Sequence, residues 1–539
     1  MGRCEEDIYV HCTKTVTDLC SRFLAHFIYT MTPAATENQN EHHIISFYKK
    51  SQRENNVRCQ NQVILEVRIA EKFSQPLQQL DGPFLVLHGD NPRDWSNLKK
   101  SMIAISVLYT AFVATFGTPI YVAAVPDAMI AFDISQTTAV VPISCHAFGL
   151  GLGALLFTAF SEVFGRRIVY RITAPLALIF TLISGSASDI TAMSIARTLT
   201  GLFVSPALTV GGGIISDIWD ISLEKSGTTF AVLYVMMIIV GTQTGPMVSA
   251  AIIAYRLSWR WVFWLPAILI GGTIVIAFCL PETYHPQLQR KHNEKVKGTM
   301  ITRETLTRLL LTSLGRPLHM LLVEPTVLPT GLVMAIMQSV VFSYFNVYTA
   351  LFKKVYHHTP HQAGMAFGAL VIGSVLALPT LALFDRIFYR KHRIAALKTG
   401  TKVPPEKRLC PAMLGFITLP ISLFWLAWTG RADIPAIVPT ISAGLFGLSF
   451  VLNMLCLPIY NSDIFHATYC SSMLGALMFM RYCVGASFPL FTPIILKRLG
   501  FAWTTSMLGF ATIALIPVPW VFFHYGPHLR SKSQYATEG

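Results

Sequence analysis

Arg197 stands in the middle of a long apolar stretch, Ser194–Leu202, of this 539-residue chain. An arginine near the centre of a bilayer costs roughly 2.5–3.5 kcal/mol on insertion scales. A chain can accept this cost when the guanidinium faces a protein interior or a water-filled cavity. The placement therefore indicates a membrane protein that moves or senses a polar solute. The alternative is a structural role, in which the guanidinium bonds to carbonyl groups and locks a helix bundle.

Other polar side chains also lie inside apolar stretches. Polar groups within hydrocarbon need partners, and a bound substrate can be one, although bonds across helices are an alternative. His146 could relay protons, because imidazole titrates near neutral pH, or it could be a satisfied packing group. The residues that we predict as candidates for lining a substrate cavity are His146, Gln243, Gln338, Tyr344, Asn346, Tyr348, Asn453 and Arg481.

Carboxylates are nearly absent from the apolar stretches. Asp217, Glu324 and Asp385 lie near the ends of these stretches, where we expect them to pair with arginines of the loops or the linker. The sequence therefore does not identify an acidic proton carrier at membrane depth.

Two short motifs combine glycine with proline or with charge. Glu162, Gly165, Arg166 and Arg167 lie between the second and third apolar stretches, and the glycine permits a tight turn there. Arginines favour the cytosolic side of a membrane, and Glu162 can pair with a base or with a helix N-terminus. Taken alone, this motif predicts either a simple positive-inside hairpin or a conformational switch.

The second motif lies in the fifth apolar stretch. Gly241 and Gly245 form a small-x-x-x-small face that permits tight helix contact. Pro246 removes a backbone donor and bends the helix. The motif predicts either an ordinary packing kink or an interface that opens and closes.

The elements that carry these residues are membrane-spanning helices. Twelve apolar segments have about the 20 residues that a helix needs to cross the hydrocarbon. They are predicted at 100–122, 137–160, 168–187, 190–214, 226–250, 261–280, 326–349, 362–384, 409–429, 434–458, 470–492 and 501–523. The longest gap divides them six and six. We therefore predict an all-α integral membrane protein with a bundle at 98–283, a linker at 284–324 and a second bundle at 325–523.

The loops differ in their content of Lys and Arg. The richer side, which includes the linker, should be cytosolic, and both termini should lie there. The N-terminal tail at 1–97 is predicted to be largely disordered, with a short amphipathic helix within 7–31 as the alternative. The C-terminal tail is predicted at 524–539.

The composition excludes several classes of protein. The chain is 53% hydrophobic and 13% charged, which is outside the range of soluble globular proteins. The formal net charge of +14 lies in loops between apolar segments, so it does not predict nucleic-acid binding. The ten cysteines form no C-x-x-C pair, and there is no P-loop. We therefore expect no metal site, no ATP-driven pumping and no enzymatic activity.

A set of motifs from residue 90 onward carries a resemblance to a known family. They include Ser161-Glu162-x-x-Gly165-Arg166-Arg167, Arg197-x-x-x-Gly201 followed by Asp217, Gly241-Thr242-Gln243-Thr244-Gly245-Pro246, and Pro281-Glu282-Thr283-Tyr284. In order and spacing they resemble the major facilitator superfamily, in the form typical of fungal twelve-span drug:proton antiporters. The chain departs from the family pattern at Ala154 and Ala159, where proline is usual.

The resemblance implies two six-helix bundles around a central cavity and transport by alternating access. It implies proton-coupled export of small amphiphilic or cationic organic compounds, such as drugs, polyamines, or a secondary metabolite or toxin. Roles in proton coupling or conformational switching are implied for Arg197, Glu162, Gly165, Arg166, Arg167, Gly241, Gly245, Pro246 and Asp217.

The same resemblance sets the expected partners and location. The proton gradient would be the energy source, without a cofactor, and the partners would be the substrate, protons and the lipid bilayer. We expect a monomer in the plasma membrane, with the vacuolar membrane as the alternative. A nutrient facilitator or importer on the same fold and a non-transporting membrane sensor are the other functions that the sequence allows.

Overall fold

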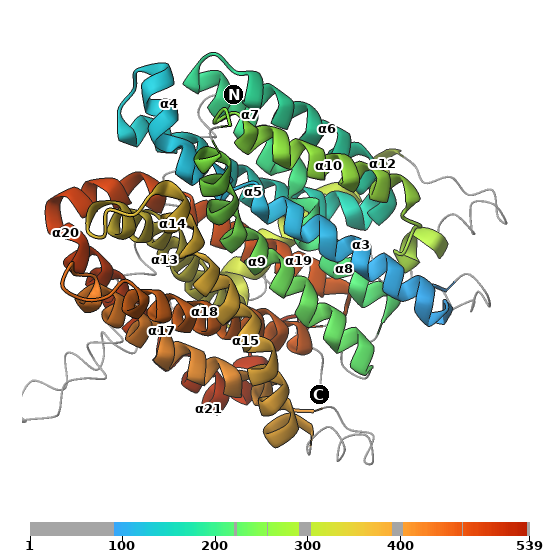
Figure 1. The fold of residues 1–539 in the computed structure, drawn as a ribbon. Helices are drawn as coiled ribbons and strands as arrows, with labels where there is room; N and C mark the ends of the chain where they lie inside the picture. Colours follow the sequence, from blue (N-terminus) through green and yellow to red (C-terminus); the bar gives the residue numbers. More distant parts are fainter. Residues whose placement is uncertain are drawn as a thin grey trace, which may run out of the picture. The chain divides into compact units, whose positions relative to one another are not determined.

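The computed structural model describes residues 91–219, 224–255, 257–289, 303–390, 403–465 and 467–535. The chain divides into two compact units, 1–75 and 76–539, and every described residue belongs to the second. The predicted helix within 7–31, most of the predicted disordered tail and part of the predicted linker lie outside the described residues. The parts of the chain that the structure describes are built from helices (Figure 1).

Helices of the N-terminal half follow the apolar segments closely. The N-termini of α3, α5 and α7 are capped by short polar side chains, as Ser96, Ser135 and Asp189 accept bonds from backbone amides of the first turn. The elements are η1 (Pro92–Asp94), α3 (Asn97–Phe116), η2 (Pro119–Ala124), α4 (Val125–Phe132), α5 (Gln136–Phe164), α6 (Arg166–Ser186), α7 (Ile190–Val204), α8 (Pro206–Ile218), α9 (Lys225–Ala254) and α10 (Trp261–Cys279).

Helices of the C-terminal half begin with α12, which is amphipathic rather than continuously apolar. The elements are α12 (Arg303–Val323), α13 (Val327–Lys354), α14 (Pro360–Met365), α15 (Gly368–Phe384), η3 (Asp385–Tyr389), η4 (Pro405–Leu409), α17 (Cys410–Thr429), α18 (Ile437–Ile464), α19 (Ala467–Gly485), α20 (Phe488–Ile513) and α21 (Pro517–Ser531).

Eleven segments of the described residues are long and apolar enough to cross a membrane. The last of them, Tyr469–Ser531, has 63 residues. At 1.5 Å per residue it would extend roughly 95 Å, about three times the thickness of the hydrocarbon core. The helix is broken at Gly500, where φ is 76° and ψ is 178°. The segment is therefore too long for a single pass, and the break at Gly500 lies between the last two predicted spans, 470–492 and 501–523.

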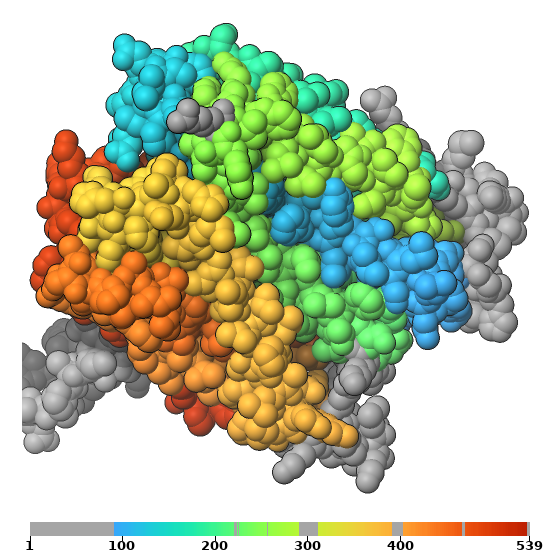
Figure 2. All heavy atoms as spheres, in the orientation of Figure 1, coloured from blue at the N-terminus to red at the C-terminus, as the bar shows by residue number. Residues whose placement is uncertain are grey.

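The two halves form two groups of helices that pack against each other (Figure 1). Helices α5 and α8 contact α19, and α9 contacts α14, α15 and α18. The space-filling view shows the two groups in contact along the face that it presents (Figure 2). Large apolar side chains such as Ile105, Ile372 and Phe510 remain exposed, as expected for surfaces that face lipid.

Small residues allow the close contact between the two groups. A Cβ added at Gly151 of α5 would lie 2.8 Å from Cys483 Sγ of α19. A Cβ added at Gly364 of α14 would overlap Ala250 of α9. These positions therefore need glycine for the helices to approach each other.

Candidate transport site

Two ends of the molecule are distinguished by their charge. We call the helix ends at 161–171, 282–289, 316–324 and 403–410 the basic face. We call the ends at 119–135, 187–190, 255–261, 355–366 and 430–437 the opposite face. The sequence-derived orientation places the basic face in the cytosol.

Glu162 joins the two groups of helices at the basic face. It lies three residues from the end of α5, and its carboxylate is buried. Oε1 accepts hydrogen bonds from Ser471 at 2.8 Å and Ser472 at 3.0 Å, both in the first turns of α19. Oε2 pairs with Nη1 of Arg316 on α12 at 3.4 Å. Glu162 therefore pairs with a base, which is one of the two forms predicted for it, and its bonds to α19 come from serine hydroxyls and not from the N-terminal amides of that helix. We call these four residues the clasp.

Gly165 makes the turn between α5 and α6. Its φ of 94° and ψ of 163° lie in a region that essentially only glycine adopts. The carboxylate of Glu282 approaches this turn and accepts from the backbone N–H groups of Arg166, at 2.9 Å, and Arg167, at 3.1 Å. A Cβ at Gly165 would lie 2.5 Å from Glu282 Oε2. Glu282 therefore caps the N-terminus of α6 from 116 residues away.

Arg166 is a buried residue and not a solvated basic residue of a loop. Its Nε lies 3.4 Å from Asp217 Oδ2 on α8, and its Nη1 donates to Ser161 Oγ at 2.6 Å. Asp217 thus pairs with an arginine, as the sequence predicts, although that arginine begins α6 and does not lie in the loop where the sequence placed it. Arg167 is half-buried, and we find no side-chain bond to it within the described residues.

Arg197 lies near the opposite face and is 2% exposed. Nη1 donates to the carbonyl of Gly117 at 2.8 Å, and Nη2 donates to the carbonyl of Thr118 at 3.1 Å. The guanidinium also lies 5.5 Å from the ring centroid of Phe263. This arrangement is the carbonyl-bonded one that the sequence left open. It ties α7 to the end of α3 and to α10.

His146 is in direct contact with the same group of residues. Its Nδ1 lies 3.1 Å from the carbonyl oxygen of Arg197, and its Nε2 has no partner among the described residues. Gly117 lies beside Nε2, because a Cβ there would be 3.7 Å from it. Nε2 of His146 therefore has no partner among the described residues and lies beside Gly117, whose carbonyl accepts from the Arg197 guanidinium.

The glycine motif of α9 packs within the N-terminal half. A Cβ at Gly241 would overlap Thr115 and come within 2.6 Å of the Phe112 carbonyl oxygen, both on α3. A Cβ at Gly245 would lie 2.7 Å from Pro119 of η2. These two glycines do not form the contact between the two groups of helices. Pro246 is buried within α9, one residue further on.

Two buried amides at membrane depth have side-chain partners on other helices. Gln243 of α9 accepts from Ser374 of α15 at 2.7 Å, which is a polar bond between the two halves. Gln338 of α13 accepts from Nε of Arg481 on α19 at 2.7 Å. The amide nitrogens of both glutamines lack partners in the described parts of the chain.

The remaining cavity candidates differ from one another. Asn453 is fully buried, and neither of its side-chain polar atoms has a partner among the residues described. Asn346 is half-buried, and its amide nitrogen donates to the Phe342 carbonyl of its own helix.

Two tyrosines of α13 belong to a buried column of aromatic rings. Tyr344 stacks on Tyr348 at 5.1 Å between centroids and on Phe446 of α18 at 4.4 Å. Phe450 continues the column at 6.0 Å from Phe446. The Tyr348 hydroxyl donates to the Ala366 carbonyl, whereas the Tyr344 hydroxyl has no partner in the described chain.

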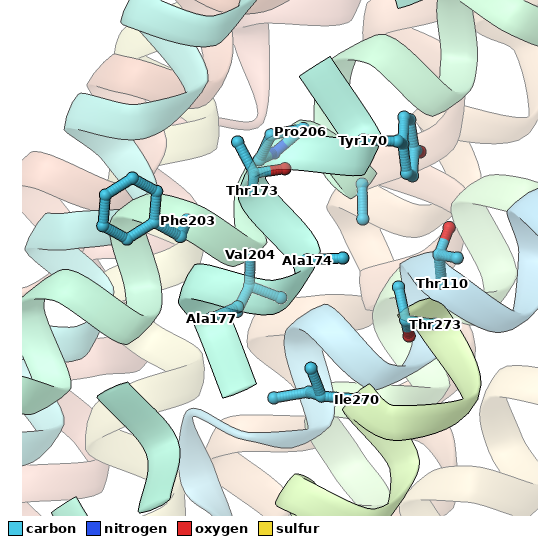
Figure 3. A pocket seen from close by; sticks show the side chains of 11 residues that line it. Thr110, Tyr170, Thr173, Ala174, Ala177, Phe203, Val204, Pro206, Ile270 and Thr273 are labelled. Carbon is cyan, nitrogen blue, oxygen red and sulfur yellow. The ribbon is translucent and has the colours of Figure 1, made fainter. Parts of the chain in front are cut away.

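A small cavity lies inside the N-terminal half (Figure 3). Thr110, Tyr170, Thr173 and Thr273 from α3, α6 and α10 surround it, and its volume is about 20 Å³. That is room for about one water molecule. A wider hollow of about 410 Å³ lies at the opposite face, bordered by Phe352, His358 and His361 among others.

Sequence reasoning missed several residues of these networks. The sequence did not indicate four of the side chains in these networks, because each has its partner more than 130 residues away in the chain. They are Arg316, Ser374, Ser471 and Ser472. Glu324 accepts from Ser533 and from backbone amides at 534 and 535. Arg290 of the linker lies outside the described residues, so the predicted pairing of Glu324 with a linker or loop arginine stays a prediction.

Comparison with known proteins gives consistent matches. Residues 107–489 match the Major Facilitator Superfamily. The chain is 30% identical over 484 residues to Polyamine transporter 4 of Saccharomyces cerevisiae, covering 83% of this chain and 72% of the relative. It is 30% identical over 458 residues to Efflux pump FUBT of Fusarium oxysporum, covering 82% and 75%. It is 29% identical over 474 residues to the Cycloheximide resistance protein of Candida maltosa, covering 83% and 84%.

A solved structure shows the same fold. The proton:xylose symporter XylE matches with a TM-score of 0.58, covering 80% of this chain and 97% of that structure. The sequence identity is 15%, so this likeness concerns the fold alone.

Proposed function

The chain belongs to the major facilitator superfamily, and we propose that it is a proton-coupled secondary transporter that exports a small amphiphilic organic compound. Its membership makes it a multi-pass membrane transporter and not an enzyme. The export direction is supported by relatives that are named as an efflux pump and a cycloheximide resistance protein. Drugs, polyamines, and a secondary metabolite or toxin are all candidate substrates.

The observation that carries the proposal is the buried polar contact between the two halves. Ser374 donates to the amide oxygen of Gln243 across them at 2.7 Å, and the amide nitrogen of Gln243 has no partner among the described residues. Burying an amide group without a hydrogen bond is costly. A seam between two helical groups that tolerates this cost is suited to hold a polar ligand at membrane depth.

Both ends of this seam are closed in the structure. The clasp around Glu162 closes the basic face. At the opposite face, Gly364 packs against Ala250, and the rings of Tyr255 and His361 meet edge to face at 6.4 Å. Transport by alternating access would open one of these contacts while the other stays closed. We place the basic face in the cytosol, the protein in the plasma membrane, and the working unit as a monomer.

Proton coupling would involve Arg197 and His146. The described carboxylates all lie within about one turn of a helix end or in connections, so a carboxylate is a poor candidate for the carrier at membrane depth. Imidazole can change its charge near neutral pH. Protonation of His146 beside the Arg197 carbonyl would alter the contact between α5 and α7. The proton gradient would be the sole energy source, and no cofactor is required.

The proposal is tested with inside-out membrane vesicles whose lumen is acidified. A panel of spermidine, cycloheximide and rhodamine 6G provides a polyamine, a neutral compound and an amphiphilic cation. We expect at least one of them to accumulate in the lumen and a protonophore to release it. If the compound only reaches equal concentrations on the two sides of the membrane, and the protonophore does not change this, the protein would be a facilitator. Purified protein in liposomes that moves no compound of the panel or of a wider library under an imposed gradient would contradict transport itself.

A further inference from the structure

The segment that follows α21 is held against α12 by hydrogen bonds to one carboxylate. Ser533 Oγ donates to Glu324 Oε2 at 2.6 Å. The backbone N–H groups of Gln534 and Tyr535 donate to Glu324 Oε1 at 2.9 and 3.1 Å. Glu324 lies directly after α12 and is 1% exposed. Burial raises the pKa of Glu324, and the three hydrogen bonds act against that rise.

Tyr535 extends this attachment toward the clasp. Its hydroxyl lies 2.9 Å from Nδ1 of His319 on α12, and its ring meets that of Tyr469 edge to face at 5.2 Å. Burial raises the pKa of Tyr535 to about 12, so the hydroxyl keeps its proton in cells. Tyr469 in turn stacks under the guanidinium of Arg316 at 5.4 Å, and Arg316 pairs with Glu162.

The contacts therefore run without a gap from the segment after α21 to the clasp. Tyr469 also stands two and three positions before the serines that bind Glu162. A second ion pair, between Arg530 and Glu406 at 3.1 Å, holds the end of α21 to η4. We call residues 533–535 the latch. Its release would remove a packing partner of Tyr469 and, through it, support for Arg316.

Ser533 is the residue of the latch that is open to chemical modification. Its side chain is half-buried at the edge of the protein, and its neighbour Lys532 is exposed. Arg530 precedes it by three residues and Lys532 by one, which is a basic context that suits the acidic substrate cleft of a basophilic kinase. A phosphate carries about −1.5 to −2 charges at pH 7. On Ser533 it would lie directly against the Glu324 carboxylate.

We propose that Ser533 is a phosphorylation site, and that its phosphorylation releases the latch and loosens the clasp at the basic face. The γ-phosphoryl group of ATP passes to Ser533 Oγ, and ADP and the hydroxyl proton leave. The product replaces a hydrogen bond from Ser533 to Glu324 with the repulsion of two anions. A kinase would phosphorylate Ser533 in the minor state in which the latch is already undocked, and the phosphate would then prevent the latch from docking again. This inference does not depend on which compound is transported.

The release is measured at Cys470, a free thiol beside Tyr469. Purified protein is treated with a polar maleimide, and mass spectrometry follows alkylation of the Cys470 peptide. We expect Ser533→Asp to accelerate this alkylation by about 10-fold or more, since a hydrogen bond to a charged group contributes about 1.5–3 kcal/mol. Ser531→Asp is the matched control. Ser531 bonds to the His528 carbonyl of its own helix and is exposed, so the same charge there should leave the rate unchanged.

A double-mutant comparison separates repulsion from simple unfolding. In the Glu324→Gln background the carboxylate is absent, so Ser533→Asp should change the alkylation rate by much less than in the wild-type background. Tyr535→Ala should accelerate alkylation without introducing charge. Equal effects of Ser533→Asp and Ser531→Asp, or an effect of Ser533→Asp that Glu324→Gln does not reduce, would overturn the release mechanism.

The modification itself is tested with ATP and the catalytic subunit of protein kinase A, a basophilic kinase, on the full-length protein. Phosphate at Ser533 in the fragment spectra, together with faster alkylation of Cys470, is the expected result. Phosphate at Ser531 alone would overturn the assignment of the site. Neither measurement needs transport activity, so a failure of proton-coupled export would leave both readouts intact.

Discussion

Replacement of Glu162 by Gln is the most direct test of how the basic face is held closed. The substitution keeps the shape of the side chain and removes its charge. The carboxylate accepts three bonds in the structure, from Ser471 at 2.8 Å, Ser472 at 3.0 Å and Arg316 at 3.4 Å. Arg316 is itself 1% exposed, so the change takes the charge of Glu162 away from a buried guanidinium.

The expected magnitude follows from the loss of that charge. Removing one member of a buried ion pair costs about 3–5 kcal/mol. The glutamine carbonyl can still accept one of the serine bonds, so we take the lower end, about 3 kcal/mol, for the closed state relative to the open one. Each 1.4 kcal/mol is a factor of ten, and the ratio of open to closed basic face should therefore rise by about 100-fold.

The native thiol of Cys470 reports this opening. Cys470 is half-buried, forms no disulfide and is next to Ser471 in sequence, and its thiol donates to the Ser462 carbonyl at 3.5 Å. When opening and closing are fast, the rate of alkylation follows the open population. Glu162→Gln should therefore speed alkylation by up to about 100-fold, until the open state predominates. Asp433→Asn, an exposed carboxylate of the opposite face, is the charge-matched control. An increase below threefold for Glu162→Gln would refute the view that this carboxylate closes the face.

Three further outcomes are expected. Gly165→Ala should lower the thermal unfolding midpoint more than Gly500→Ala. Both glycines have positive φ, where backbone strain alone costs an alanine about 1–3 kcal/mol, but only a Cβ at position 165 would also meet a carboxylate. Arg197→Ala should abolish proton-linked export while the protein still reaches the membrane, and normal export by this variant would remove the role proposed for the residue. The raised pKa of Glu324 means that its contribution to stability is fully present below its ordinary pKa of about 4.5 and is lost as pH rises through the folded-state value. The unfolding midpoint of the wild type should therefore fall relative to that of Glu324→Gln between pH 4 and pH 7, and a constant difference would contradict this sign.

The helices could be predicted from the sequence because their causes are local. A run of about 20 apolar residues and a capping serine or aspartate lie within a single element, and both are visible in the chain. The turn at Gly165 was predictable for the same reason. The broken helix at Gly500 was placed between two predicted spans by composition alone.

The partners of the polar side chains could not be predicted in the same way. Glu282, which caps α6, lies 116 positions from Arg166 in the chain. The serines that bind Glu162 lie more than 300 positions from it. No periodicity links such positions. The sequence shows that Glu162 needs a partner, and only the packing of α5 against α19 and α12 decides which one it receives. The same limit explains Glu324, which among the described residues is bonded by the segment after α21.

The two faces of the seam are closed by different physical means, and this difference bears on how the protein would be controlled. The basic face depends on a buried carboxylate, a guanidinium and two hydroxyls, so a change of charge nearby shifts its equilibrium. At the opposite face Gly364 packs against Ala250, and the rings of Tyr255 and His361 meet edge to face, so added volume there would disturb the contact directly. A charge added beside the clasp would therefore act first on the basic face. The latch lies on the side where charge is effective, which is the side on which the orientation predicted from the loops places cytosolic ATP.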